Sequence, residues 1–198
     1  MNKSLVALSR DPVMKMLIRL YGELTLAGSE PTEYFSDLAK NIIGQQLSGK
    51  AADTITARVL ALMGGSFGTK KIISQSEQSL REAGMSYNKI AYMKNLSRAV
   101  LAKSLDLENI EDYGDDEIIA QITAIKGLGN WTAEMFLIFS LARGDVYSLG
   151  DGGLSRSVNI LYGRGKLLGK EEIKKISEKW KPYRSLACLY LWKSLHNR

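Results

Sequence analysis

The sequence contains only one cysteine and one histidine, and these scarcities exclude several kinds of site. The single cysteine, Cys188, cannot form an intramolecular disulfide or supply a four-cysteine zinc or iron–sulfur site. Its apolar neighbours predict a buried structural thiol rather than a nucleophile. The single histidine, His196, lies next to the C-terminus, so we expect neither a histidine-based triad nor a multi-histidine metal site.

Long hydrophobic runs are also missing from the sequence. No stretch approaches eighteen apolar residues, and residues 1–10 lack the continuous apolar segment of a signal peptide. We therefore expect neither a membrane span nor secretion. The predicted location is the cytoplasm, in association with the nucleoid, or the nucleus.

Acidic residues are outnumbered by basic ones. The chain of 198 residues has 27 lysines and arginines against 21 acidic residues, which gives a net charge of +6. This excess favours an anionic partner, although charge alone does not separate DNA from RNA or from an acidic membrane surface. The length suffices for one domain, or two closely packed lobes, with a sizeable core.

Apolar residues recur at helical spacing almost throughout the chain, with little alternation of period two, and this predicts an all-α protein. The first predicted helix begins near Pro31 and carries Tyr34, Leu38, Ile42 and Ile43 on one stripe. The other predicted helices cover 51–63, 76–83, 88–101, 115–125, 131–141, 154–162, 170–179 and 183–196. No domain linker is evident, so residues 1–198 are expected to form a single folded unit, which is compatible with a cleft between two helical lobes.

The segment Lys126-Gly127-Leu128-Gly129-Asn130 joins two of these helices as a tight hairpin. Two glycines allow positive φ in the turn, and they let another molecule approach the backbone closely. Leu128 is expected to point inward, while Lys126 and Thr132 can add a charge and a hydroxyl to a phosphate contact. A phosphate-binding hairpin is one reading, and a plain helical hairpin with glycine caps is the other.

Asp151 follows Trp131 by twenty positions and stands in a glycine-rich approach to a predicted helix. Aspartate is a preferred N-cap residue, so a purely structural role is one reading. A catalytic carboxylate is the other, and the two roles are compatible because a helix N-terminus favours negative charge.

Four segments together resemble a known family: Ile42 to Ser48, Ile125 to Met135, Asp145 to Asp151 and Lys181 to Ala187. In this combination the chain, from about residue 35 onward, resembles the helix–hairpin–helix (HhH-GPD) DNA glycosylases. Within them it is most similar to the 3-methyladenine DNA glycosylase II branch of alkylation repair. The resemblance implies a two-lobed helical fold, with lobes 36–131 and 1–35 plus 132–198 and the active cleft between them.

The resemblance implies that the protein flips out alkylated purines and hydrolyses their N-glycosidic bond in base excision repair. The aspartate corresponding to Asp151 is essential in this family, and a fixed carboxylate stabilises the positive charge that builds on the sugar. Lyase-competent relatives carry a lysine where Trp131 stands, and an indole cannot form a Schiff base. We therefore expect a monofunctional glycosylase that leaves the strand intact.

The resemblance also assigns residues to the flipped base and to the gap it leaves. Trp131 and Trp192 match positions that line a base pocket, with Met135 and Tyr147 as further candidates. The loop 84–88 matches the segment that fills the gap, with Tyr87 or Met85 as the wedge. The alternative readings are core packing for Trp192 and an incidental loop tyrosine for Tyr87. The pair Gln45-Gln46 could contact DNA or cap a helix.

One departure from the family pattern is Gly150, because relatives often carry a second acid there. The expected partner is double-stranded DNA with damaged bases, bound by a monomer without a membrane contact. No side-chain cluster demands a metal or cofactor, although hairpin carbonyls could hold a structural monovalent cation. A glycosylase for hypoxanthine, uracil or an oxidised purine, and a noncatalytic DNA-binding protein, remain alternatives.

Overall fold

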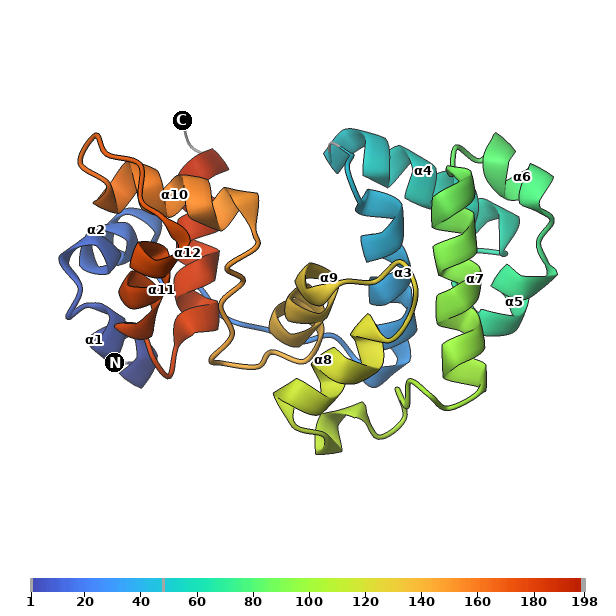
Figure 1. Ribbon diagram of the computed structural model, residues 1–198, viewed down its shortest axis with the longest axis horizontal. Coiled ribbons are helices and arrows are strands. Elements are labelled where there is room, and N and C mark those ends of the chain that lie inside the picture. The colour runs from blue at the N-terminus through green and yellow to red at the C-terminus, as the bar shows by residue number, and fades with distance from the viewer. Residues whose placement is uncertain (1, 48, 197–198) are drawn as a thin grey trace. The chain divides into compact units, whose positions relative to one another are not determined.

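The chain is all-helical in the computed structural model, which describes residues 2–47 and 49–196 (Figure 1). The side chain of His196, and Ser48 of the first family-like segment, lie outside the described residues. No strand occurs in the described ranges, so the prediction of an all-α protein is confirmed. The chain divides into two compact units, of which unit 1 comprises Met1–Gly28 and Leu137–Arg198 and unit 2 comprises Ser29–Phe136. The expected cleft between two lobes stays a prediction.

Unit 2 consists mainly of helices that follow one another directly along the chain. Their bounds are η1 (Pro31–Glu33), α3 (Tyr34–Gly44), α4 (Gly49–Leu62), α5 (Thr69–Ser74), α6 (Glu77–Glu82), α7 (Tyr87–Leu101), η2 (Ile110–Asp112), α8 (Asp115–Thr123) and α9 (Asn130–Met135). Ser76 caps α6 and Ser86 caps α7. Gly64 and Gly65 adopt positive φ just after α4, as expected for a glycine-terminated helix.

The core of unit 2 is built from the stripe predicted on α3. Tyr34, Leu38, Ile42 and Ile43 are all buried there, together with Ile90, Met93 and Leu96 on α7 and Ile118 and Ile122 on α8. Each fully buried aliphatic side chain of this size stabilises the fold by about 1.5–3 kcal/mol. The pairing of α3 with α7 and of α8 with α9 holds the hairpin that joins α8 to α9.

Unit 1 is formed by the two ends of the chain. Its helices are α1 (Lys3–Leu8), α2 (Pro12–Tyr21), α10 (Gly152–Tyr162), α11 (Lys170–Glu178) and α12 (Arg184–His196). The α12 helix is buried along most of its length, with Ala187, Cys188, Tyr190 and Leu191 fully enclosed. The prediction of a buried structural thiol at Cys188 is therefore confirmed.

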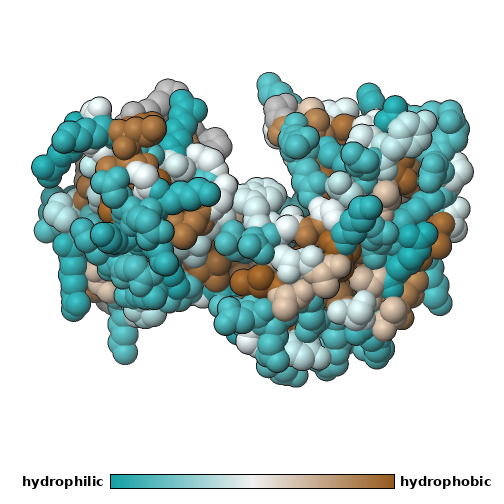
Figure 2. Space-filling model, in the orientation of Figure 1, coloured by the Kyte–Doolittle hydropathy of each residue, from teal (hydrophilic) through white to brown (hydrophobic). Residues whose placement is uncertain are grey.

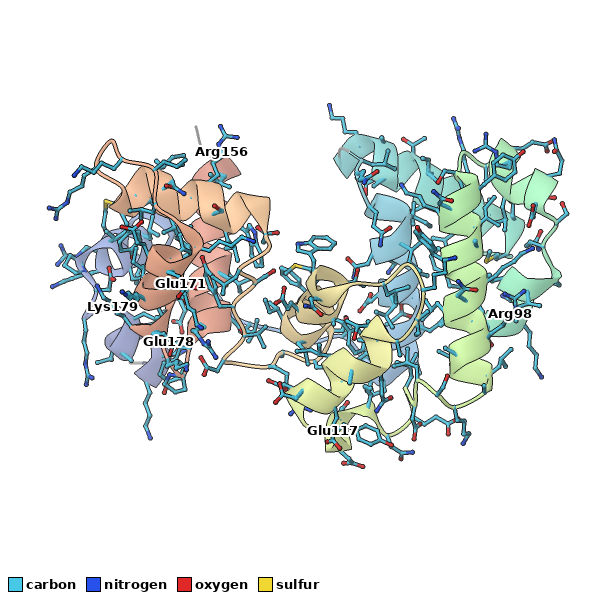
Figure 3. The ribbon with its side chains drawn as sticks, in the orientation of Figure 1. Arg98, Glu117, Arg156, Glu171, Glu178 and Lys179 are labelled. Atoms are coloured by element: carbon cyan, nitrogen blue, oxygen red, sulfur yellow. The ribbon has the colours of Figure 1, made fainter. Side chains whose placement is uncertain are left out.

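The surface of unit 1 is mostly charged. Arg156 on α10, Glu171 and Glu178 on α11, and Lys179 just after α11 point outward (Figure 3). In the face that Figure 2 displays, hydrophilic side chains cover most of the outer surface of each unit. No helix in the described ranges is long and apolar enough to cross a membrane.

Two features of the fold differ from the sequence-based expectation. Helices α1, α2 and α5 were not predicted, although Asp11 caps α2 and Pro12 occupies its first position. The helix predicted over 131–141 changes at Phe136 into the wider π-type turn η3 (Phe136–Ser140). Along the chain the two units divide at 28/29 and 136/137, close to the approximate lobe boundaries expected at 35/36 and 131/132, and Tyr34 and Phe136 pack edge to face at 5.5 Å within unit 2.

Candidate active site and DNA-binding hairpin

The hairpin between α8 and α9 exposes some of its residues and buries others. Leu128 is buried, as predicted, and it anchors the turn in the core of unit 2. Lys126, Gly129 and Asn130 are exposed. Gly129 is the N-cap of α9, and as a glycine it has no side chain that could cap the helix. The exposed backbone at the start of α9 suits the approach of an external anion.

The two hairpin glycines have different roles. Gly127 adopts φ +105°, and a Cβ there would overlap the ring of Tyr92 from α7. Gly129 has φ −113° and ψ −179°, and a Cβ there would meet nothing within 4 Å. The expectation of positive φ at both glycines is thus wrong for Gly129. The backbone of Gly129 is extended, so the turn itself does not require glycine there. The missing side chain leaves open space that a ligand can occupy.

Amide side chains hold the hairpin in place from two directions. Gln45 donates a hydrogen bond from Nε2 to the carbonyl of Gly127 at 3.2 Å. Asn95 of α7 donates from Nδ2 to the carbonyl of Lys126, also at 3.2 Å. Gln45 was predicted to contact DNA or to cap a helix, and the roles of Asn95 and Tyr92 were not predicted. Their spacing on α7, at positions 92 and 95, was the available signal.

A hollow of about 370 Å³ opens beside the hairpin in unit 2. It is lined by Gln45, Gln46, Gly129, Trp131 and Thr132. Trp131 is 39% exposed there, an unusual position for an indole that a folded core could have covered. Thr132 is largely buried but also lines this hollow, so its predicted hydroxyl contact with a phosphate stays a prediction. Trp131 therefore offers an aromatic face next to the exposed backbone of Gly129.

Asp151 is the N-cap of α10 in unit 1, as the structural reading predicted. Its Oδ1 accepts hydrogen bonds from the backbone N–H of Leu154 at 2.7 Å and from Nε1 of Trp192 at 3.0 Å. The side chain is half-buried, and the helix N-terminus favours its negative charge. A fixed, oriented carboxylate of this kind can stabilise a cation or position a water molecule.

Phe139 packs on Trp192, the residue that donates a hydrogen bond to this carboxylate. Their ring centroids lie 5.4 Å apart with an interplanar angle of 31°, and Phe139 is 46% exposed. A Cβ at Gly153 would lie 3.1 Å from Oδ1 of Asp151 and 3.3 Å from Cδ1 of Trp192, so glycine permits this close arrangement. Phe139 was not predicted, because it lies in the π-type turn Phe136–Ser140, where a regular helical period does not apply.

The segment that leads to Asp151 is fastened to the start of α12. Arg184 binds Asp145 through Nε to Oδ1 at 2.7 Å and through Nη2 to Oδ2 at 3.1 Å. Ser185 accepts from the N–H of Val146 at 2.9 Å and donates to the carbonyl of Arg143 at 2.5 Å. This explains structurally why the segments 145–151 and 181–187 occur together.

Two of the predicted pocket residues are buried in the hydrophobic interior. Tyr147 belongs to the core of unit 1 and packs on Trp180 with ring centroids 5.8 Å apart. Met135 is buried in unit 2. The resemblance implied a pocket role for Tyr147, but in this structure its ring packs on Trp180 in the segment between α11 and α12. We therefore expect Tyr147 to pack the core of unit 1, and its role in a base pocket stays a prediction.

The buried hydroxyl of Tyr147 has no hydrogen-bond partner among the described residues. Burial raises the pKa of this phenol, so it stays neutral. We expect Tyr147→Phe to leave base release unchanged and to raise the free energy of unfolding by up to about 1 kcal/mol, since an unpaired polar group is removed.

Tyr190→Phe is the matched control, because the Tyr190 hydroxyl donates to the carbonyl of Gly22 at 2.8 Å and accepts from the N–H of Leu24 at 3.1 Å. Denaturant unfolding should show opposite signs for the two variants, and a loss at Tyr147 equal to that at Tyr190 would contradict the assignment.

The two candidate wedge residues differ sharply in exposure. Tyr87 is 65% exposed at the start of α7, whereas Met85 is fully buried. Arg81 lies over the Tyr87 ring at 4.5 Å and donates to the carbonyl of Met85 at 2.7 Å. Met85 could insert into DNA only after leaving the core, so Tyr87 is the remaining candidate.

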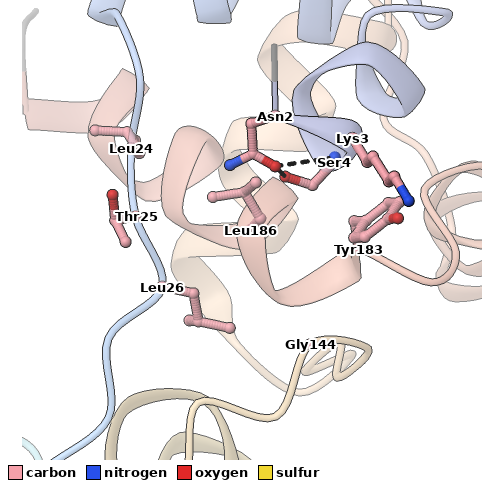
Figure 4. Close-up of a pocket in the computed structure, with 9 residues that line it drawn as sticks. All are labelled: Asn2, Lys3, Ser4, Leu24, Thr25, Leu26, Gly144, Tyr183 and Leu186. Atoms are coloured by element: carbon pink, nitrogen blue, oxygen red, sulfur yellow. Dashed lines mark hydrogen bonds between the residues drawn. The ribbon is translucent and has the colours of Figure 1, made fainter.

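Metal sites and further hollows were also considered as candidate sites among the described residues. No cluster of three or more histidine, cysteine or acidic side chains suitable for a metal ion occurs there. The carbonyls of Lys126 and Gly127 each accept one amide hydrogen bond, and the expectation of a monovalent cation at the hairpin stays a prediction. A hollow of about 290 Å³ in unit 1 is lined by Leu24, Thr25, Leu26, Gly144, Tyr183 and Leu186 together with residues 2–4 (Figure 4). None of the predicted site residues lines it.

The helical fold, the glycine hairpin and the capping aspartate together define a class of DNA repair protein. Residues 39–182 match the HhH-GPD superfamily of base excision DNA repair proteins, and the chain belongs to this family. Among curated relatives, DNA-3-methyladenine glycosylase 1 of Schizosaccharomyces pombe is 34% identical over 93% of this chain and 82% of its own. DNA-3-methyladenine glycosylase of Saccharomyces cerevisiae is 30% identical over 94% of this chain and 76% of its own.

Solved structures agree with this assignment. A DNA-3-methyladenine glycosidase from Bacillus halodurans is 39% identical, covers 98% of this chain and 89% of its own, and gives a TM-score of 0.85. The S. pombe 3-methyladenine DNA glycosylase Mag1, solved in complex with abasic DNA, is 32% identical over 97% of this chain and 96% of its own, with a TM-score of 0.88.

Proposed function

We propose that this protein is a monofunctional DNA glycosylase that flips out alkylated purines and hydrolyses their N-glycosidic bond in base excision repair. The observation that carries the proposal is the half-buried carboxylate of Asp151, held by the N-terminus of α10 and by Nε1 of Trp192. Membership of a base excision repair family and similarity to 3-methyladenine glycosylases support it.

The carboxylate suits the charge that develops during the reaction. As the base departs, its bonding electrons leave with it and positive charge builds on the sugar. A carboxylate that is already oriented stabilises this charge without reorganisation, and it can also orient the attacking water. An alkylated purine is cationic before cleavage, so it leaves without a strong acid catalyst. A glycine at position 150, where relatives often carry a second acid, is consistent with this reaction.

Aromatic side chains suit recognition of a cationic base. Trp192 contacts Asp151 in unit 1 and packs on Phe139, and Trp131 presents an exposed indole in unit 2. A well-placed ring stabilises a cation by about 0.5–2 kcal/mol. Because Trp131 stands where lyase-competent relatives carry a lysine, no amine attacks the sugar at this position and the strand should stay intact.

DNA binding is assigned to two exposed features of unit 2. The backbone of Gly129 and Asn130 contacts a phosphate without reading sequence, with Lys126 supplying charge. Tyr87 fills the gap left by the flipped nucleotide, which is an established way to unstack DNA. The protein acts as a monomer wherever the cell keeps its DNA, in the cytoplasm with the nucleoid or in the nucleus.

A panel of duplexes with single lesions tests this function directly. The panel contains 3-methyladenine, 7-methylguanine, 1,N6-ethenoadenine, hypoxanthine and uracil, each opposite its normal partner. We expect release of free base from the two methylpurines, with strand breaks only after alkali. Release of hypoxanthine or uracil alone would assign a different lesion, and release of no base would leave a noncatalytic DNA-binding protein.

A further inference from the structure

A basic and apolar surface lies on α10 and on the loop that follows it in unit 1. Gly152, Arg156 and Ile160 recur every four residues on the exposed face of α10. The loop 163–169 folds back along this face, and the two enclose a hollow of about 750 Å³ lined in addition by Gly165, Lys166 and Leu167. We call this the α10 surface, comprising Arg156, Ile160, Arg164, Lys166 and Leu167.

The loop is held in a defined conformation. Asn159 donates from Nδ2 to the carbonyl of Ser155 at 2.9 Å and accepts at Oδ1 from the N–H of Leu168 at 2.6 Å. The N–H of Lys166 binds the carbonyl of Gly163 at 2.8 Å. A Cβ at Gly163 would collide with the carbonyl oxygens of Asn159 and Lys166. These contacts fix the conformation of the loop and keep its tip exposed.

The loop and α10 expose apolar side chains that do not pack in the core of unit 1. Leu167 is 90% exposed and Ile160 is 40% exposed. Three cations, Arg156, Arg164 and Lys166, are exposed around them, and none forms an ion pair with an acidic residue in the described part of the chain. No acidic side chain lines the hollow. Figure 3 shows Arg156 pointing away from α10, and Figure 2 shows hydrophobic side chains among hydrophilic ones on this unit.

We propose that the α10 surface binds the sugar–phosphate backbone of the DNA strand next to the flipped nucleotide. This rests on the proposed function, because α10 begins at the carboxylate that would face the sugar. Arg156 lies five residues after Asp151, roughly 7 Å farther along the helix axis, within reach of an adjacent phosphate. Cations neutralise phosphates, and Leu167 covers the apolar edge of deoxyribose. A docking groove for an apolar segment of another protein would not account for three exposed cations that have no acidic partner.

The double variant Arg156→Gln, Lys166→Gln tests this surface. Binding to an undamaged duplex is measured by fluorescence anisotropy over a range of salt concentrations. Each lost phosphate contact lowers the slope of log K against log salt by about 0.9, so the double variant should lose about 1.8 and bind roughly tenfold more weakly at low salt. Leu167→Ser should weaken binding without changing the slope, since an apolar contact releases no counterion.

The matched control is Lys174→Gln, Lys175→Gln on the exposed part of α11, which removes the same charge from the same unit. It should keep the wild-type slope. An unchanged slope in the Arg156, Lys166 variant, or an equal loss in the control, would overturn the proposal and leave the surface to a protein partner. Because only binding is measured, this outcome is distinct from failure of the wild type to release any base.

Discussion

Replacing Asp151 by asparagine should reduce base release at least about 10³-fold, which corresponds to roughly 4 kcal/mol of transition-state stabilisation. The amide oxygen can still accept the hydrogen bonds that Oδ1 receives from Leu154 and Trp192. The cap of α10 and the position of the side chain are therefore kept, and only the negative charge is lost. Single-turnover release of 7-methylguanine from a duplex, with enzyme in excess, measures the effect.

The affinity of the Asp151→Asn variant for abasic DNA should stay level or rise, since a negative charge near phosphates is removed. Trp192→Phe is the companion variant, because it removes the Nε1 donor and keeps a ring against Phe139. It should slow base release far less than Asp151→Asn does. If Asp151→Asn weakened DNA binding as much as catalysis, a direct catalytic role for the charge would be excluded.

Alanine at the two hairpin glycines should give opposite phenotypes. Gly127→Ala forces a side chain into a left-handed conformation and into the ring of Tyr92, so we expect a loss of about 2–4 kcal/mol in the free energy of unfolding. Gly129→Ala places its methyl group in open space on an extended backbone, so stability should change by less than about 0.5 kcal/mol. Thermal or denaturant unfolding distinguishes the two.

DNA affinity completes this comparison. The methyl group of Gly129→Ala stands where a phosphate would approach the backbone, so binding should weaken by a similar factor for every duplex sequence. Wild-type affinity in this stable variant would mean that the hairpin does not contact the phosphate. The opposite pattern, with Gly127→Ala stable and Gly129→Ala unfolded, would contradict the conformations assigned to the two glycines.

Much of the helical framework could be predicted from local signals. The stripe on α3 and the glycines after α4 are set by interactions between residues close in sequence, and both lie where the pattern predicted them. Leu128 was likewise predicted to anchor the hairpin. The signals for α2 were also local, an aspartate cap followed by Pro12, and they were overlooked rather than missing.

The site depends more on contacts between residues distant in sequence. Asp151 and Trp192 are 41 residues apart, and no periodicity indicates that they form a hydrogen bond. Tyr147 and Tyr87 are both tyrosines near glycine-containing loops, but packing against Trp180 buries the first and leaves the second exposed. The wide turn at Phe136–Ser140 also shifts the helical register beyond what a regular period predicts.

The central claim is that the carboxylate of Asp151 faces the sugar of the extruded nucleotide. A crystal structure with a duplex that carries a stable abasic or cationic sugar analogue tests it most directly. We expect a carboxylate oxygen of Asp151 within about 3–3.5 Å of the anomeric centre or of the water that attacks it. A sugar bound elsewhere, with Asp151 contacting only Leu154 and Trp192, would contradict it.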